Sequence, residues 1–110
     1  MHPRRRLVLS LLAGALAPRL GHAQSARRIP RVGVLWHAGS AEEEAPYLEA
    51  LLAGFRSLGY DDGRTIALDH RFPNEEPAKF ERMAIELVAT KPDILLAANV
   101  SSALALQKAT

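Results

Sequence analysis

The stretch Arg31-Val32-Gly33-Val34-Leu35-Trp36 decides the fold of this chain. It is a short apolar run, bounded by Pro30 before it and by a small polar loop after it. Runs of this length and composition are typical of strands that are buried on both faces of a parallel sheet. The next segment has apolar residues at helical spacing, with Pro46 near its start and Gly59 at the C′ position, so a helix that begins near Ala45 should follow the strand. The apolar positions of that helix are Leu48, Leu51, Leu52, Phe55 and Leu58.

The alternation of strand and helix occurs twice more along the chain. Residues 65–72 alternate apolar and polar at a period of two, which predicts a half-buried strand at a sheet edge. An apolar stripe from Phe80 to Val88 predicts a helix that ends before Lys91-Pro92. Residues 93–97 predict a third strand, and Asn99 opens a last helix. Helices between successive strands imply right-handed parallel crossovers. We therefore expect an α/β fold with a doubly wound parallel sheet, in which the first strand lies between the second and the third.

Two loops follow the first and third strands of this predicted sheet. In open α/β sheets, ligands sit beyond the carboxyl ends of the strands, at the point where the strand order reverses. That point lies between the first and third strands, so residues 36–40 and 99–102 should carry the binding chemistry. The predicted ligand-binding residues are Trp36, His37, Gly39, Ser40, Asn99, Ser101 and Ser102.

Each of these side chains also has a structural alternative. Trp36 would stack on an apolar part of a ligand or pack on a helix, which is the commoner use of a tryptophan. His37 would donate to a carboxylate or be an exposed loop residue. Ser101 and Ser102 add hydroxyls to the free N–H groups of a helix N-terminus, which together can receive a carboxylate, but serine is also a common cap there. For Asn99 the two alternatives are ligand contact and turn chemistry.

Three consecutive glutamates, Glu42 to Glu44, stand just before the first predicted helix. We interpret them as a solvated acidic first turn that is stabilised by the helix dipole and that would repel a ligand carboxylate. Ser40 and Glu43 match a capping box, although a helix that began there would place Pro46 in its interior. His70, on the apolar face of the second strand, is expected to be a half-buried packing residue. Neither this histidine nor His37 has a partner at metal-ligand spacing, so no metal site is predicted.

The sequence lacks the motifs that enzymes of this fold class use. It contains no G-x-G-x-x-G and no G-x-x-x-x-G-K-[ST], so dinucleotide and P-loop sites would lack their phosphate cradle. No G-x-S-x-G elbow surrounds a serine. The absence of cysteine excludes disulfides, thiolate metal sites and a thiol nucleophile. We therefore expect no cofactor, no catalytic residues and no enzymatic activity.

The N-terminus has the order of a secretory signal peptide. Arg4 to Arg6 precede an apolar run from Leu7 to Ala17, and the small residues of Gly21-His22-Ala23 follow. The run has about 11 residues, whereas a helix needs about 20 to span a bilayer. We predict that residues 1–23 are a signal peptide cleaved after its last alanine, and that residues 24–110 form the mature α/β domain. The general secretory route and the twin-arginine route both remain open.

Cleavage would change the charge of the chain. Residues 1–23 contain four of the 14 basic residues and none of the 12 acidic ones, so the formal net charge would fall from +2 to −2. No basic block would remain that could bind nucleic acid through its phosphates. Without a cysteine the exported chain cannot carry a lipid anchor, so we expect it to be free in the periplasm of a Gram-negative cell.

Four segments of the chain resemble the ABC transporter substrate-binding family of the periplasmic binding protein-like I fold. They are Arg31 to Leu35, Leu51 to Arg64, Ala84 to Asp93 and Ala103 to Thr110. The turn G-F-R-x-L-G-Y-x-x-G-R, followed by L-V-x-x-K-P-D, is the most specific part. The resemblance implies two α/β lobes that close on a small solute, amino acids included. It also implies ABC transporter permease subunits as partners, with the membrane reached only through the permease. Full-length members are far longer than this chain.

Three hypotheses for the function follow. The first is a solute-binding component of an ABC-type import system, in which Ser101 and Ser102 contact the solute and Glu42 to Glu44 do not. The second is a truncated fragment without independent activity, which the abrupt end after a helix favours. The third, an α/β enzyme domain, is the least favoured because the sequence shows neither a cofactor loop nor a supported nucleophile. The core side chains expected to face the sheet are Leu52, Phe55, Leu87 and Val88.

Overall fold

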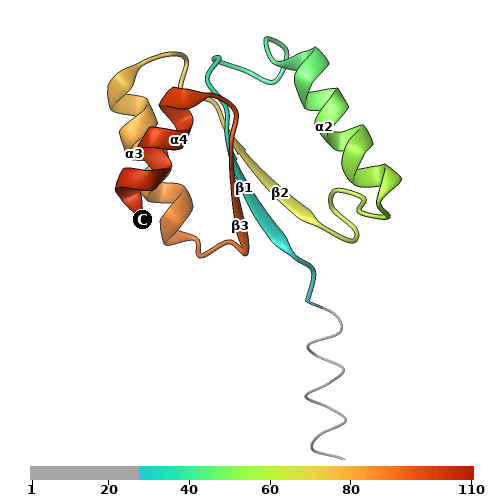
Figure 1. The fold of residues 1–110 in the computed structure, drawn as a ribbon. Coiled ribbons are helices and arrows are strands. Elements are labelled where there is room, and N and C mark those ends of the chain that lie inside the picture. Colours follow the sequence, from blue (N-terminus) through green and yellow to red (C-terminus); the bar gives the residue numbers. More distant parts are fainter. Residues whose placement is uncertain (1–27) are drawn as a thin grey trace, which may run out of the picture.

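A parallel sheet of three strands organises the chain in the computed structural model, which describes residues 28–110. The strands are β1 (Arg31–Leu35), β2 (Ala67–Arg71) and β3 (Ile94–Ala97), in the order β2-β1-β3 (Figure 1). The predicted α/β fold, with its first strand in the middle of a parallel sheet, is confirmed. The predicted signal peptide lies outside the described residues.

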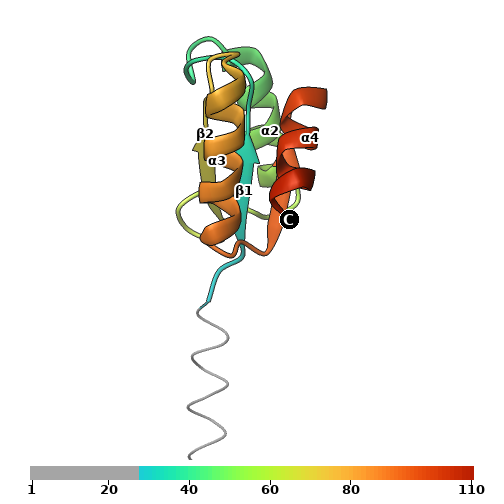
Figure 2. The same ribbon diagram turned by 90° about the vertical axis from the view of Figure 1, so that its left-hand side faces the viewer.

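Helices cover both faces of the sheet, but unequally. Helix α2 (Ala45–Ser57) lies alone on one face, and helices α3 (Pro77–Ala89) and α4 (Val100–Ala109) share the other (Figures 1 and 2). Helix α2 begins at Ala45 as predicted, with a proline in its first turn, where the missing N–H has no cost. Its end is also as predicted, because Gly59 adopts a left-handed φ of 91° just beyond the C-cap. No helix within residues 28–110 is long and apolar enough to cross a membrane.

The face under α3 and α4, which we call the closed face, has a tightly packed core. Leu35, Ala84 and Leu87 are fully buried there, and Phe80 and Leu106 are nearly so. Two leucine side chains lie close to the backbone of Gly33, where an added Cβ would lie 3.0 Å from Leu87 Cδ2 and 3.1 Å from Leu95 Cδ2. Glycine in the central strand therefore allows the side chains of α3 and β3 to meet over it. This confirms that Leu87 faces the sheet.

The face under α2, which we call the open face, is covered less completely. Val32, Val34, Trp36 and Ile66 are buried there, yet no residue of α2 itself is fully buried. The helix packs on them through three partly buried side chains, which are Leu48, Leu51 and Phe55.

Three of the apolar positions expected to pack behave differently from the prediction. Leu52 and Val88 are only partly buried and belong to neither core cluster. Leu58 is 74% exposed because the helix ends at Ser57 and leaves this side chain at the C-cap. The sheet-facing stripe of α2 is therefore narrower and shorter than the sequence suggested.

Candidate functional site

The loop that leaves β1 is bound to the loop that leaves β2, beyond the last paired residues of the two strands. Glu75 N donates to His37 O at 2.8 Å, and Asn74 N donates to Ala38 O at 2.9 Å. Asn74 and Glu75 reach these positions with left-handed φ angles of 55° and 56°. Such angles cost a non-glycine residue about 1–2 kcal/mol each, so this geometry is held by the surrounding contacts. The two loops form one ordered rim at the carboxyl edge of the sheet.

Gly39 and Ser40, both predicted to bind a ligand, have clear roles in the rim. A Cβ at Gly39 would lie 2.9 Å from Glu43 Oε1 and closer still to Asn74 Oδ1, so a glycine allows the two loops to meet. Ser40 Oγ accepts from Glu43 N at 3.2 Å and lies 3.4 Å from Glu43 Oε1. One of the two capping-box contacts, from Glu43 N to Ser40 Oγ, therefore exists, but in the turn before α2 and without Pro46 in a helix interior.

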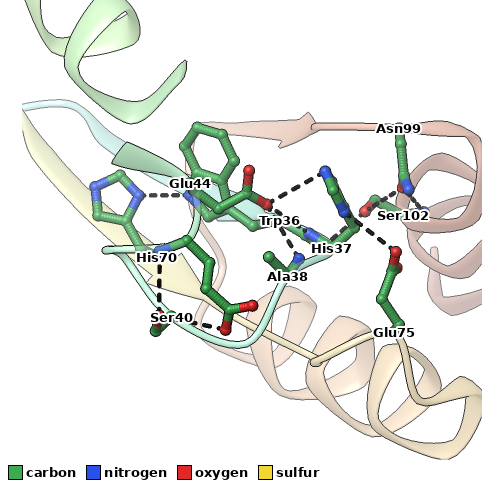
Figure 3. A network of polar contacts seen from close by, with 10 residues as sticks. Trp36, His37, Ala38, Ser40, Glu44, His70, Glu75, Asn99 and Ser102 are labelled. Atoms are coloured by element: carbon green, nitrogen blue, oxygen red, sulfur yellow. Dashed lines mark hydrogen bonds and ion pairs between the residues drawn. The ribbon is translucent and has the colours of Figure 1, made fainter. Parts of the chain in front are cut away.

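Among the three consecutive glutamates, Glu44 differs most from the expected exposure to solvent. Glu42 and Glu43 are exposed, as a solvated acidic turn requires, but Glu44 is only 2% exposed. It occupies the N-cap position of α2 without capping that helix. Instead its Oε2 accepts from His37 N at 3.2 Å and from Ala38 N at 3.1 Å (Figure 3). The interpretation of Glu44 as a solvated residue was wrong, because the loop after β1 folds back over this carboxylate.

His37 lies between two carboxylates that come from different loops. Its Nε2 is 3.4 Å from Glu44 Oε2, and its Nδ1 is 3.4 Å from Glu75 Oε2 (Figure 3). Nδ1 is buried, and neither contact has the geometry of a hydrogen bond in the structure. The sequence spacing gives no sign of this arrangement, because Glu75 comes from the loop after β2.

Trp36 is 5% exposed and packs between α2 and β2, as its structural alternative predicted. Its Nε1 donates to His70 Nδ1 at 2.9 Å, and its ring stacks on Phe72 with centroids 6.4 Å apart. Burial lowers the pKa of His70 below its ordinary value of 6.5, and this outweighs the opposing effect of Asp62 and Asp69. His70 is thus partly buried as predicted, and it also accepts the indole proton. The pairing could have been anticipated, because both residues lie on the same face of adjacent strands.

The second predicted loop fastens α4 to β1. Asn99 is the N-cap of α4, and its Oδ1 accepts from Ser102 N at 2.9 Å. Ser102 is fully buried, and its hydroxyl lies 2.9 Å from Trp36 O and 2.8 Å from Asn99 Oδ1. Its single proton serves one of these two acceptors at a time. The described contacts of Asn99 and Ser102 are therefore those of capping and anchoring, whereas Ser101 is exposed.

Two hollows open beside this rim, and they divide the predicted residues. The first, of about 710 Å³, lies beside α2 on the open face. Its lining includes Trp36, His37, Glu44, Tyr47, Leu51 and Leu96. The second, of about 560 Å³, lies between α3 and α4 and includes Glu75, Phe80, Ser101 and Leu104. His37 stands between them, because it lines the first hollow and contacts Glu75 of the second.

The hollows have the size and the mainly apolar lining that are common in small-molecule sites. Both volumes fall in the range of about 300–1,000 Å³ that is usual for small-molecule sites. Most of their lining is apolar or aromatic, with a few polar groups at the rim. Residues 28–110 contain no cluster of three or more histidine and acidic side chains arranged to hold a metal ion. The geometry defines a small α/β domain with one hollow at the carboxyl ends of β1 and β3 and another between α3 and α4.

Comparison with known proteins supports the fold. No family model matches the chain, and no curated protein matches it. A similar solved structure is that of a conserved domain protein from Vibrio cholerae O1 biovar eltor str. N16961, with a TM-score of 0.67 and 25% sequence identity. The match covers 76% of this chain and 28% of that one, so the chain spans less than a third of the length of that structure.

Proposed function

We propose that this chain is the solute-binding component of an ABC-type import system, or its N-terminal part, and that it binds a small solute such as an amino acid without turnover. One observation carries the proposal: the hollow beside α2 opens at the carboxyl ends of β1 and β3 and is lined by Trp36 and His37. That is where open α/β sheets hold their ligands. The sequence resemblance to substrate-binding proteins agrees with this position.

The contacts around the hollow suit binding better than chemistry. Its rim is held by the two inter-loop hydrogen bonds and by the anchor from Ser102 to Trp36 O, so little rearrangement is needed when a solute arrives. Trp36 and Tyr47 offer aromatic surface, and Tyr47 is 70% exposed. In the proposed role, a second lobe would close over the solute, and the loaded protein would then dock on its permease.

A titration tests the proposal directly. The purified chain should be screened by thermal shift and calorimetry against the amino acids and small carboxylates. We expect at least one class of solute to raise the melting temperature and to be recovered unchanged after incubation. Chemical conversion of the solute would instead support an α/β enzyme. Absence of binding by any solute would favour the alternative of a fragment without independent activity.

Ser101 tests which of the two hollows receives the solute, because it lines the hollow between α3 and α4 and not the one beside α2. It is exposed beside the first turn of α4, where a hydroxyl and free N–H groups can receive a carboxylate. For a solute held beside α2 we expect Ser101→Ala to bind with unchanged affinity. A solute carboxylate bound at Ser101 would instead lose one hydrogen bond to a charged group, and binding would weaken about tenfold or more. A matched Ser57→Ala variant, at the exposed end of α2, should bind as the wild type does. Unchanged affinity of Ser101→Ala would remove this serine from the site.

The export part of the proposal has its own test. Residues 1–23 have the order of a cleaved signal peptide, so mass spectrometry of periplasmic extract should find a chain that begins at or close to Gln24. An uncleaved chain that begins at Met1 and stays in the cytosol would contradict both the periplasmic location and the role in import.

A further inference from the structure

We infer that Glu44 receives a cationic amine of the solute in the hollow beside α2, so that the preferred ligands combine an ammonium group with an apolar or aromatic body. The inference rests on the proposed solute-binding function and names the class of solute for that same hollow. It also reverses the expectation that all three glutamates, Glu42 to Glu44, stay away from the solute.

The two oxygens of the Glu44 carboxylate differ in their contacts. Oε2 accepts from His37 N and Ala38 N, which fixes the side chain in place. Oε1 has no hydrogen bond within the described part of the chain, and it retains access to solvent although the residue as a whole is only 2% exposed and lines the hollow. A carboxylate oxygen at the wall of a hollow, without a donor from the protein, can accept a hydrogen bond from a ligand.

The charge at the wall of this hollow comes from Glu44 and His37. Glu44 is the only acidic or basic side chain, apart from His37, among the residues that line this hollow. The His37 ring is shared between Glu44 and Glu75, each at 3.4 Å, so one imidazole faces two carboxylates. Even a protonated His37 would leave this group of three with one net negative charge. A cationic ligand group would neutralise this charge, and a ligand carboxylate would add to it.

The remaining walls of this hollow are apolar or aromatic. Around Glu44 the hollow is lined by Val34, Trp36, Leu51 and Leu96, with Tyr47 at its exposed side. Apolar and aromatic surface of this kind stabilises an apolar body, and aromatic faces also attract cations. The volume of about 710 Å³ holds a ligand larger than a bare ammonium ion. The site therefore selects for an amine that carries a hydrophobic group.

A pair of probes that differ in one group tests the inference. Phenethylamine carries the ammonium, and 2-phenylethanol replaces it with a neutral hydroxyl on the same body. In calorimetric titrations of the full chain, we expect phenethylamine to bind at least about tenfold more tightly than 2-phenylethanol, since the amine adds a charge-assisted hydrogen bond. Glu44→Gln should remove this preference, whereas Glu43→Gln, at the exposed neighbour, should keep it.

A second variant leaves Glu44 in place, in case Glu44→Gln disturbs the loop that it holds. Tyr47 is exposed on the same helix three residues further on, so Tyr47→Lys would bring a tethered ammonium toward Glu44. Tyr47→Gln removes the same ring without adding a charge. We expect Tyr47→Lys to lose phenethylamine binding at least about tenfold relative to Tyr47→Gln, because the lysine occupies the position of the ligand amine.

The outcomes separate this inference from the proposed function. If the two probes bind equally, and neither Glu44→Gln nor Tyr47→Lys changes this, the cation site is overturned. The hollow would then be a solute site that recognises only the apolar body of its ligand. Failure of both probes to bind, while another solute of the screen binds, would overturn the amine assignment and keep the solute-binding function. Failure of every solute and both probes would overturn the two together.

Discussion

The two faces of the sheet differ in how completely they are covered, although the same three strands form both. On the closed face, two helices bury Leu35, Ala84 and Leu87 completely. On the open face, the single helix α2 buries none of its own residues, and Leu96 of β3 is only partly buried. One helix covers this face, whereas two helices cover the closed face. The uncovered part is where the larger hollow and Glu44 lie.

Under the proposed function, this difference would separate stability from binding within one small domain. The closed face supplies close packing, with apolar side chains meeting over Gly33. The open face supplies a polar pair, Trp36 and His70, and a buried carboxylate at its edge. We therefore expect substitutions on the closed face to change the free energy of unfolding most, and those on the open face to change ligand binding more than stability.

The largest effect is expected at Leu87, which is fully buried in the closed core. Leu87→Ala should lower the free energy of unfolding by about 3–5 kcal/mol, from lost burial and the cavity that remains. Urea unfolding followed by circular dichroism would measure it. A loss under about 1 kcal/mol would mean that the closed face is loosely packed and that the comparison of the two faces fails.

A pair of glycines gives the next largest effect, with opposite signs. Gly33→Ala would force a methyl group against Leu87 and Leu95, and such overpacking costs about 1–3 kcal/mol. Gly54, inside α2, has nothing within 4 Å of an added Cβ, so Gly54→Ala should stabilise the helix by about 1 kcal/mol. Thermal unfolding of both variants would show the two signs. A destabilised Gly54→Ala would indicate that α2 is more enclosed than the structure shows.

Phe55 is expected to give a moderate effect. It is partly buried on the open face and lies edge-on to Tyr60, with ring centroids 6.3 Å apart. Phe55→Ala should therefore cost about 1–2 kcal/mol, less than the roughly 3–5 kcal/mol of a fully buried phenylalanine. Chemical denaturation of Phe55→Ala and Leu87→Ala under the same conditions would compare the stability that each face contributes. A cost equal to that of Leu87→Ala would show the two faces to be packed alike.

The smallest effect is a pH dependence that arises from His70. Because burial holds its pKa in the folded chain below 6.5, the unfolded chain binds more protons once the pH falls below that value. Stability should thus be complete above 6.5 and decrease as the pH falls toward the lowered pKa. His70→Asn keeps an acceptor for Trp36 Nε1 but does not titrate. Denaturation at about pH 7.5 and 5.5 should show a weaker pH dependence in this variant, and equal slopes would contradict the assignment.

Most of the fold could be predicted from the sequence because local periodicity and turn chemistry agree with it. The helix start at Ala45 and the left-handed Gly59 were both predicted from single residues in context. The third strand begins at Ile94, one residue later than expected. Just before it, Asp93 N donates to Arg31 O at 2.8 Å, and the carboxylate of Asp93 accepts from Arg31 N at 2.8 Å and from the Arg28 side chain at 2.9 Å. Such boundary contacts depend on residues far away in the sequence.

The site was less predictable, for a related reason. The topology predicted that the loops after β1 and β3 lie at one edge of the sheet, but the orientation of Glu44 depends on the path of the backbone between Trp36 and Ser40. No local pattern distinguishes a buried glutamate from its two exposed neighbours. The contact between His37 and Glu75 likewise depends on two consecutive left-handed residues in another loop. Sequence reasoning therefore predicted which loops meet at the carboxyl edge of the sheet, but not the charges that meet there.

The hydrogen bonds from Asn74 N and Glu75 N to the loop after β1 have a consequence for the kinetics of recognition. They should protect these two amides from hydrogen exchange almost as well as amides of the strands, despite their place in an exposed connection. A solute arriving at such a rim would meet an opening that already has its bound shape, so association would involve no slow reordering of loops. Discrimination between solutes would then lie in how quickly each one leaves.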